Sequence, residues 1–161
     1  MMRSDAARQC WPLQATRAAL VRFALAGTAL LLVFGCSLAK LTASVPAGAE
    51  LGKLKSFYVV RHERDGRGIN ELIRNDLVTR RLEATTGPEA GRPKTAEAIV
   101  TYEDQWMWDI TMYMLSLNVS FRHPETNTLL ASGQSYRPSL ERKEPRDIVK
   151  EVLDEIFKGA K

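Results

Sequence analysis

The sequence predicts an α+β domain in which a mostly antiparallel sheet of four to five strands carries two helices on one face, in the order β-α-β-β-β-β-α. Three observations support this class. Two segments, starting at residues 69 and 145, place apolar side chains at helical spacing. Every second residue from 113 to 121 is apolar, and most residues between them are polar, which indicates a long strand with one buried face. The loop HPETNT then separates this strand from a second β-rich run, which predicts a hairpin.

The first half of the domain reads as a strand, a helix and a short strand. Residues 57–60 (FYVV) are β-rich and are followed by the polar, glycine-bearing RHERDGRG. Ile69, Leu72, Ile73 and Leu77 then follow the i, i+3, i+4, i+8 spacing of an amphipathic helix of about 12–15 residues. A short strand at residues 83–86 ends where GPEAGRPK introduces two glycines and two prolines.

The second half contains the hairpin and the closing helix. Residues 98–102 predict an apolar strand, and YEDQWMWD, which begins at residue 102, is interpreted as a solvated turn after it. In the long strand, one face is expected to be buried and the other to carry Met112 and Met114. The buried face comprises Tyr113, Leu115, Leu117, Val119 and Phe121. Residues 129–136 return as the partner strand, and Pro145 suits the first turn of the final helix.

Residues 1–35 are interpreted as a signal peptide. Arginines precede residues 23–34 (FALAGTALLLVF), a run of twelve without charge. A spanning helix needs roughly 20 apolar residues, so this run instead fits the apolar core of a secretory signal. Positive charge before it predicts that the following segment is exported. An uncleaved signal anchor is the alternative interpretation.

The end of this run resembles the lipobox of bacterial lipoproteins. In Val33-Phe34-Gly35-Cys36 a small residue precedes a cysteine, although valine replaces the commoner leucine and Phe34 is bulky for its place. The resemblance implies cleavage before Cys36 and lipidation of its thiol, and two or three acyl chains such as palmitate suffice to hold a protein to a bilayer. Ser37 stands where inner-membrane lipoproteins often carry aspartate, which implies the periplasmic leaflet of the outer membrane.

Residues 36–55 are interpreted as a flexible tether and residues 56–161 as one periplasmic domain. The tether is rich in small residues and shows no sustained period. The order of elements that follows is similar to that of small periplasmic lipoprotein domains, including uncharacterised families and the N-terminal domain of the Tol-Pal translocation protein. The segment EAIVTY, at residues 97–102, resembles a DxxV(T/A)Y-like strand of several such families. This resemblance implies an accessory role in the envelope and carries over no catalytic residue.

Charge and cysteine content exclude two classes. The chain has a net charge of +4, but residues 1–35 hold four arginines against one aspartate, which leaves nineteen basic and eighteen acidic residues in the remainder. The remainder lacks the concentrated basic face of a nucleic-acid-binding protein. Cys10 and Cys36 are the only cysteines, so the domain after residue 36 has no disulfide framework.

We predict a binding or scaffold protein rather than an enzyme, with no cofactor and no metal. Grouped aromatic and methionine side chains are typical of contact surfaces, and Trp106, Trp108, Met112 and Met114 are the expected partner-binding residues. A metal-assisted hydrolase using the 103–109 carboxylates and a small-ligand carrier using the two tryptophans are the alternatives. The chain contains no HExxH motif and no calcium-binding loop, and DGRG at residues 65–68 is better explained by a strand-to-helix turn than by a phosphate site.

Overall fold

The structure is a computed structural model that describes residues 38–160. The predicted signal peptide and the predicted lipidation site Cys36 lie outside the described residues, so both stay predictions. None of the helices within residues 38–160 is long and apolar enough to cross a bilayer.

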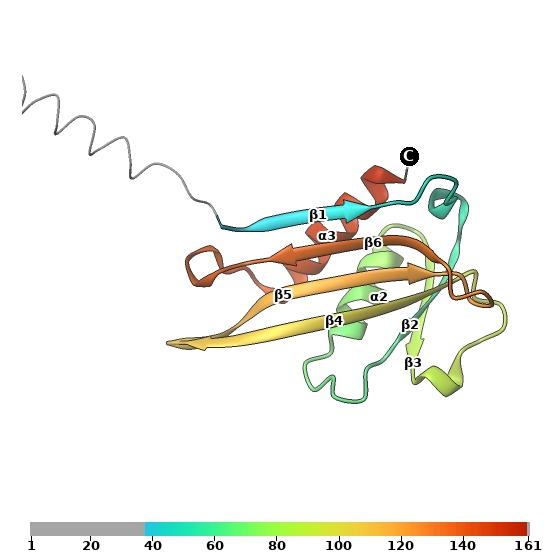
Figure 1. Cartoon of the computed structure of the whole chain (residues 1–161). Helices are drawn as coiled ribbons and strands as arrows, with labels where there is room; N and C mark the ends of the chain where they lie inside the picture. The colour runs from blue at the N-terminus through green and yellow to red at the C-terminus, as the bar shows by residue number, and fades with distance from the viewer. Residues whose placement is uncertain (1–37, 161) are drawn as a thin grey trace, which may run out of the picture. The chain divides into compact units, whose positions relative to one another are not determined.

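The described chain forms an α+β domain, as the sequence predicts (Figure 1). The strands are β1 (Lys40–Ser44), β2 (Ser56–Val60), β3 (Glu83–Gly87), β4 (Ala98–Asp109), β5 (Thr111–Arg122) and β6 (Leu129–Tyr136). The helices are α2 (Ile69–Thr79) and α3 (Pro145–Gly159), and three short 3-10 turns are η1 (Leu51–Lys53), η2 (Glu89–Gly91) and η3 (Ser139–Glu141).

The sheet has six strands in the order β1-β6-β5-β4-β2-β3 and is mixed. Neighbours from β1 to β4 are antiparallel, whereas β2 pairs in parallel with both β4 and β3. The parallel β2–β3 pair follows from α2, because a helical crossover returns the chain to the end of the sheet from which it left. The predicted α+β class is therefore correct. The prediction of a mostly antiparallel sheet of four to five strands misses one strand and the parallel pairing of β2 with β3 and β4.

The missing strand comes from the segment predicted to be a tether. β1 pairs with β6 along its whole length, and Leu51 in η1 is completely buried. The prediction of a flexible tether over residues 36–55 is therefore wrong for these parts. Only Leu41 of β1 packs against the core, while Lys40, Thr42 and Ser44 are exposed, so five residues of an edge strand carry too little apolar pattern to be recognised.

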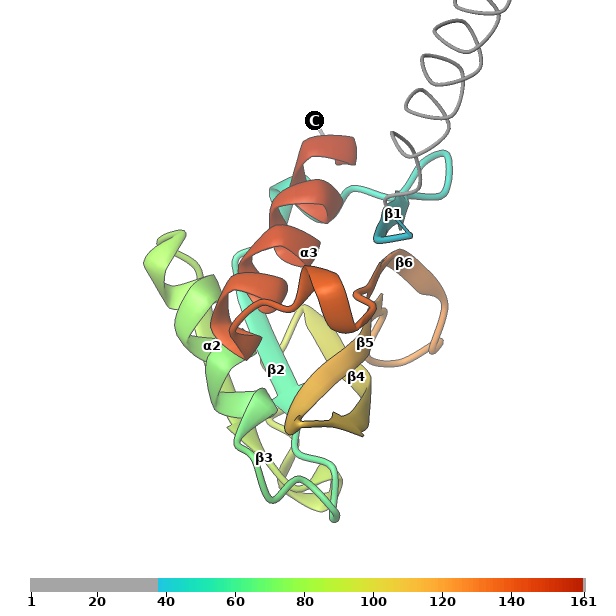
Figure 2. The same ribbon diagram turned by 90° about the vertical axis from the view of Figure 1, so that its left-hand side faces the viewer.

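Both helices cover the same face of the sheet, as predicted (Figure 2). Their apolar stripes form the core with the inward residues of the strands. The partly buried ring of Phe157 packs edge to face against the buried rings of Phe57 and Phe121, which also meet edge to face. At Gly133 on β6 a Cβ atom would lie 2.7 Å from Ile156, so this glycine lets α3 approach the sheet closely.

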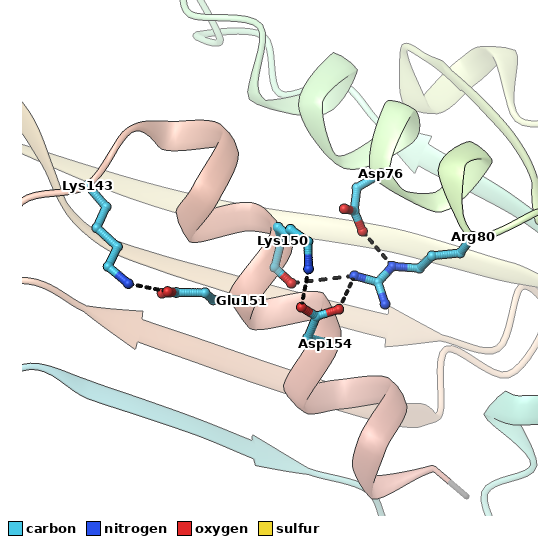
Figure 3. A network of polar contacts seen from close by, with 6 residues as sticks. All are labelled: Asp76, Arg80, Lys143, Lys150, Glu151 and Asp154. Carbon is cyan, nitrogen blue, oxygen red and sulfur yellow. Dashed lines mark hydrogen bonds and ion pairs between the residues drawn. The ribbon is translucent and has the colours of Figure 1, made fainter.

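The two helices are joined by an ion-pair network (Figure 3). Arg80, just after α2, donates to Asp76 at 2.5 Å and to Asp154 of α3 at 2.7 Å. Lys150 also contacts Asp154 at 2.6 Å, and the Arg80 guanidinium lies 5.4 Å from the ring centre of Phe157. Because the arginine side chain is only 22% exposed, these contacts hold the helix pair together more effectively than an isolated surface pair.

Candidate functional site

The site develops from the long hairpin of β4 and β5. The segment YEDQWMWD was expected to be a turn, but β4 continues through it to Asp109, and the chain reverses at Ile110. That prediction is wrong because the segment pairs with β5 as a strand. β5 follows later in the chain, so the residues of the segment alone do not reveal this pairing. The hairpin therefore extends well beyond the part of the sheet covered by the helices (Figure 1).

A bulge divides the hairpin into two halves. Gln105 lies opposite Ser116, but the next residue, Trp106, lies opposite Met114, which leaves Leu115 without a partner on β4. A slip of one residue turns every following side chain to the opposite face. Met114 consequently points into the core and is 1% exposed. The predicted position on the outer face is wrong for both Met112 and Met114, and the buried Met114 is removed from the candidate contact surface.

The four predicted partner-binding residues therefore separate into two pairs. Trp106 and Met114 lie opposite each other and pack with the core. Trp108 and Met112 form the next pair along the same face, beyond the helices, and are 68% and 45% exposed. Trp108 and Met112 are thus exposed, and their role in binding a partner stays a prediction.

Three further apolar side chains gather at this end. Met107 is 46% exposed, Ile110 at the turn is 85% exposed, and Leu140 in η3 is 98% exposed. Together with Trp108 and Met112 they form what we call the hairpin patch. Strand periodicity did not identify them, because Ile110 belongs to the turn and η3 joins this region only through tertiary contacts.

The turn holds Ile110 in a strained conformation. Its φ of 60° lies in the left-handed region, where a β-branched side chain is disfavoured by about 1–2 kcal/mol. Glycine or asparagine would adopt this conformation more readily. The turn therefore places an apolar side chain in solvent in a strained backbone conformation, and strain of this kind is found at functional sites.

Arg142, just after η3, fixes the hairpin end to the rest of the domain. Its guanidinium donates to the Asp109 carboxylate at 2.9 Å, to the Asp109 carbonyl at 2.8 Å and to the Thr111 hydroxyl at 2.7 Å. It also lies 4.6 Å from the ring centre of Tyr113. The Ser139 hydroxyl contacts the same carboxylate, which brings its neighbour Leu140 beside the hairpin. The charges at the edge of the patch are thereby paired within the domain.

The carboxylates of the hydrolase alternative do not converge. Glu103 lines the open face of the sheet near Asn118, Asp104 accepts the indole N–H of Trp106, and Asp109 is paired with Arg142. The described residues contain no group of three His, Cys, Asp or Glu side chains placed to hold a metal ion. The carrier alternative assigns a pocket to Trp106 and Trp108. Trp106 lines an open hollow of about 340 Å³ together with Met112 and Met114.

Both histidines serve local turns. The Nδ1 atom of His62 accepts the backbone N–H of Arg64 at 3.2 Å. The Nδ1 atom of His123 accepts two backbone N–H groups of the β5–β6 loop, from Glu125 and Thr126. Each imidazole therefore accepts hydrogen bonds within its own loop, which follows β2 for His62 and β5 for His123.

The turn before α2 supplies its own anion. The Asp65 carboxylate accepts the backbone N–H groups of Arg67, Gly68 and Asn70 at 2.9, 2.7 and 3.1 Å, and the Tyr102 hydroxyl at 2.6 Å. Burial raises the pKa of Asp65, but these hydrogen bonds outweigh it and hold the pKa below its ordinary value. The groups that a phosphate would contact are therefore already occupied, and the same carboxylate ties the loop to β4.

Comparisons with known proteins identify the fold. No protein-family model and no curated protein match the chain. Two crystal structures of the PelC dodecamer from Paraburkholderia phytofirmans, one of them of a single-residue variant, superpose with TM-scores of 0.56 and 0.55 at 14% sequence identity. The matches cover 73% of this chain and 97% and 96% of the PelC chains, which shows a shared fold.

A more distant likeness involves a PDZ domain protein from Parabacteroides distasonis. Its TM-score is 0.45 at 10% identity, and the match covers 70% of this chain and 34% of that one. A likeness at this level supports no argument about fold or function.

Proposed function

We propose that the protein is a lipid-anchored scaffold or accessory protein of the bacterial cell envelope, and that it acts by binding through the hairpin patch rather than by catalysis. The observation that carries the proposal is the patch itself: large apolar side chains gathered on an end of the domain that Arg142 and Ser139 hold in place. Exposed apolar groups of this kind mark interaction sites in soluble domains. The separation of the carboxylates gives the hydrolase alternative less support.

The anchor in this proposal is Cys36. The support is the apolar run that ends at the lipobox-like Val33-Phe34-Gly35-Cys36, together with the positive charge before it. The residue that follows the cysteine is Ser37 rather than aspartate, which supports a location at the periplasmic leaflet of the outer membrane. Incorporation of labelled palmitate into the wild-type chain but not into Cys36→Ser is the expected result, and equal labelling of both contradicts the anchor.

Self-association forms part of the proposal. PelC, which shares the fold, is a dodecamer. A chain that works as a scaffold gains repeated, identical contact surfaces by assembling with copies of itself. The mass of the native protein, measured by light scattering after gentle extraction, is expected to be a multiple of the chain mass, whereas a monomer at all concentrations contradicts this part.

Cysteine labelling in intact cells tests whether the hairpin patch is covered. The chain has no cysteine after Cys36, so Trp108→Cys and Val78→Cys each introduce a single reactive site. Trp108 is 68% exposed and Val78, on α2, is 48% exposed, so in an uncovered domain position 108 is the more accessible. If the patch binds a partner, a water-soluble maleimide labels position 108 more slowly than position 78 in cells.

Both rates are normalised to labelling of the same variants after unfolding in urea, which removes differences in expression. Faster labelling at position 108 than at position 78 would show an open patch and would contradict binding through it.

A further inference from the structure

The start of β1 and the hairpin patch lie at the same end of the sheet. Lys40 lies opposite Tyr136, Tyr136 lies opposite Ser116, and Ser116 lies opposite Gln105, so these residues form one row across four strands. β1 runs from this row away from the hairpin turn, because its other end, Ser44, lies opposite Ser132. The chain therefore enters the domain on the side toward which the hairpin projects (Figure 1).

Chain length limits how far the predicted anchor can lie from that row. Cys36 precedes Lys40 by four residues, which reach at most about 14 Å when fully extended. The hairpin continues beyond Gln105 through Asp109, another four residues, which extend about 14 Å as strand. A bilayer that holds acyl chains on Cys36 is thus within reach of the hairpin turn, since residues 40–44 of the predicted tether are folded into the sheet.

The exposed apolar residues of the domain are concentrated at this end. Of the eight large hydrophobic side chains exposed within residues 38–160, five form the hairpin patch. Two others are Leu38, just before β1, and Tyr136, in the row described above, while Val78 on α2 is the exception. Tryptophan and tyrosine beside aliphatic side chains make up the composition that favours the interface between headgroups and acyl chains.

Three basic residues near the hairpin patch are paired with carboxylates of the domain. Arg142 is paired with Asp109, and Lys143 and Arg137 are both paired with Glu151. Each pair is formed within the domain, so the patch does not bring an unpaired charge into the bilayer through these residues.

We propose that the hairpin patch inserts into the surface of the bilayer to which Cys36 is anchored, and that the domain is thereby held in one orientation on the membrane. The inference rests on the proposed lipid anchor and names the partner of the hairpin patch. Insertion is shallow, about 5–10 Å, because beyond Gln105 β4 and β5 pair only with each other in the described sheet and their outer backbone edges need water or headgroups.

Fluorescence of the acylated protein in vesicles tests the proposal. Trp106 and Trp108 are the only tryptophans after Cys36, since Trp11 belongs to the predicted signal peptide. Trp106→Phe therefore leaves Trp108 as the reporter, and Trp108→Phe leaves Trp106 as a matched control. Both variants are reconstituted into phosphatidylcholine vesicles with brominated acyl chains. We expect Trp108 to lose most of its emission and Trp106, packed on the core, to keep most of its own.

Ile110→Asp in the Trp106→Phe background is a second variant. The side chain is 85% exposed, so the fold is retained, and the acyl chains still carry the protein to the vesicles. We expect the charge to restore most of the Trp108 emission, because a carboxylate at the turn withdraws the hairpin from the bilayer.

The remaining outcomes are distinct. If the protein floats with the vesicles but bromine leaves Trp108 emission unchanged, insertion is overturned, and protection of Trp108 from aqueous acrylamide in that case would identify a second copy of the chain as the occupant. If the protein neither incorporates palmitate nor floats, the lipid anchor itself fails and the inference fails with it.

Discussion

The two halves of the β4–β5 hairpin contain similar residues and have opposite surroundings. In the basal half, Val100 and Tyr102 on β4 and Val119 on β5 are buried under the helices. In the distal half, Trp108 and Met112 are also apolar, but they are 68% and 45% exposed to solvent. The difference lies in what covers the strands, because the helices end before the hairpin does. An apolar strand face is thus core or contact surface according to the layer above it.

Substitution of two neighbouring methionines tests this comparison most strongly. Met114→Glu places a carboxylate where the side chain is 1% exposed, and we expect it to lower the free energy of unfolding by more than about 4 kcal/mol. Met112→Glu, at 45% exposure, is expected to change it by less than about 0.5 kcal/mol. Urea denaturation followed by circular dichroism measures both. Similar losses for the two variants would show that the bulge does not separate core from surface.

The basal half is also tied to the loop before α2, and Asp65→Asn tests that tie. We expect a loss of about 2 kcal/mol, because the carboxylate accepts three backbone N–H groups and the Tyr102 hydroxyl. Thermal denaturation compared between the wild type and the variant measures it.

The same contact predicts a pH dependence. The pKa of Asp65 is lowered in the folded state, so its contribution is present above the unfolded pKa of about 3.9 and is lost as the pH falls through the lower folded value. The stability of Asp65→Asn should therefore fall less steeply with acid below about pH 4 than that of the wild type. Parallel acid profiles would assign the pH dependence to other carboxyl groups.

The distal half depends on Arg142, and its removal should loosen that half alone. Arg142→Ala is expected to cost about 1–2 kcal/mol, because its charged hydrogen bonds to Asp109 and Thr111 are lost while the side chain is only partly buried. Hydrogen exchange should accelerate in residues 106–113 and remain unchanged in α2. Uniform acceleration over the whole domain would show that the hairpin end is not an independent unit.

The smallest effect is expected at the turn itself. Ile110→Gly relieves the positive φ and removes a side chain that is 85% exposed, so it should raise stability by about 1 kcal/mol. The same variant should weaken quenching of Trp108 by brominated lipid. A gain in stability together with unchanged quenching would show that Ile110 does not contribute to the membrane contact.

Much of the fold was predictable because its signals are local. The stripes of α2 and α3, the alternation of β5 and the loop HPETNT each follow from residues within one element. Half of the candidate site followed in the same way, since aromatic and methionine side chains around Trp108 and Met112 indicate a contact surface wherever they are exposed. Met107, Ile110 and Leu140 were not identified, because nothing near them in sequence shows that the covering helices stop short of the hairpin end.

The sequence by itself determined the α+β class, the two helices and the inward face of most strands, because periodicity records which side of an element must leave water. Only the tertiary structure decided that residues 40–44 form an edge strand, that Leu115 bulges and turns Met114 inward, and that the hairpin extends past the helices. These features depend on hydrogen bonds and contacts between residues far apart in the chain, and a local pattern carries no record of the partner that a strand will meet.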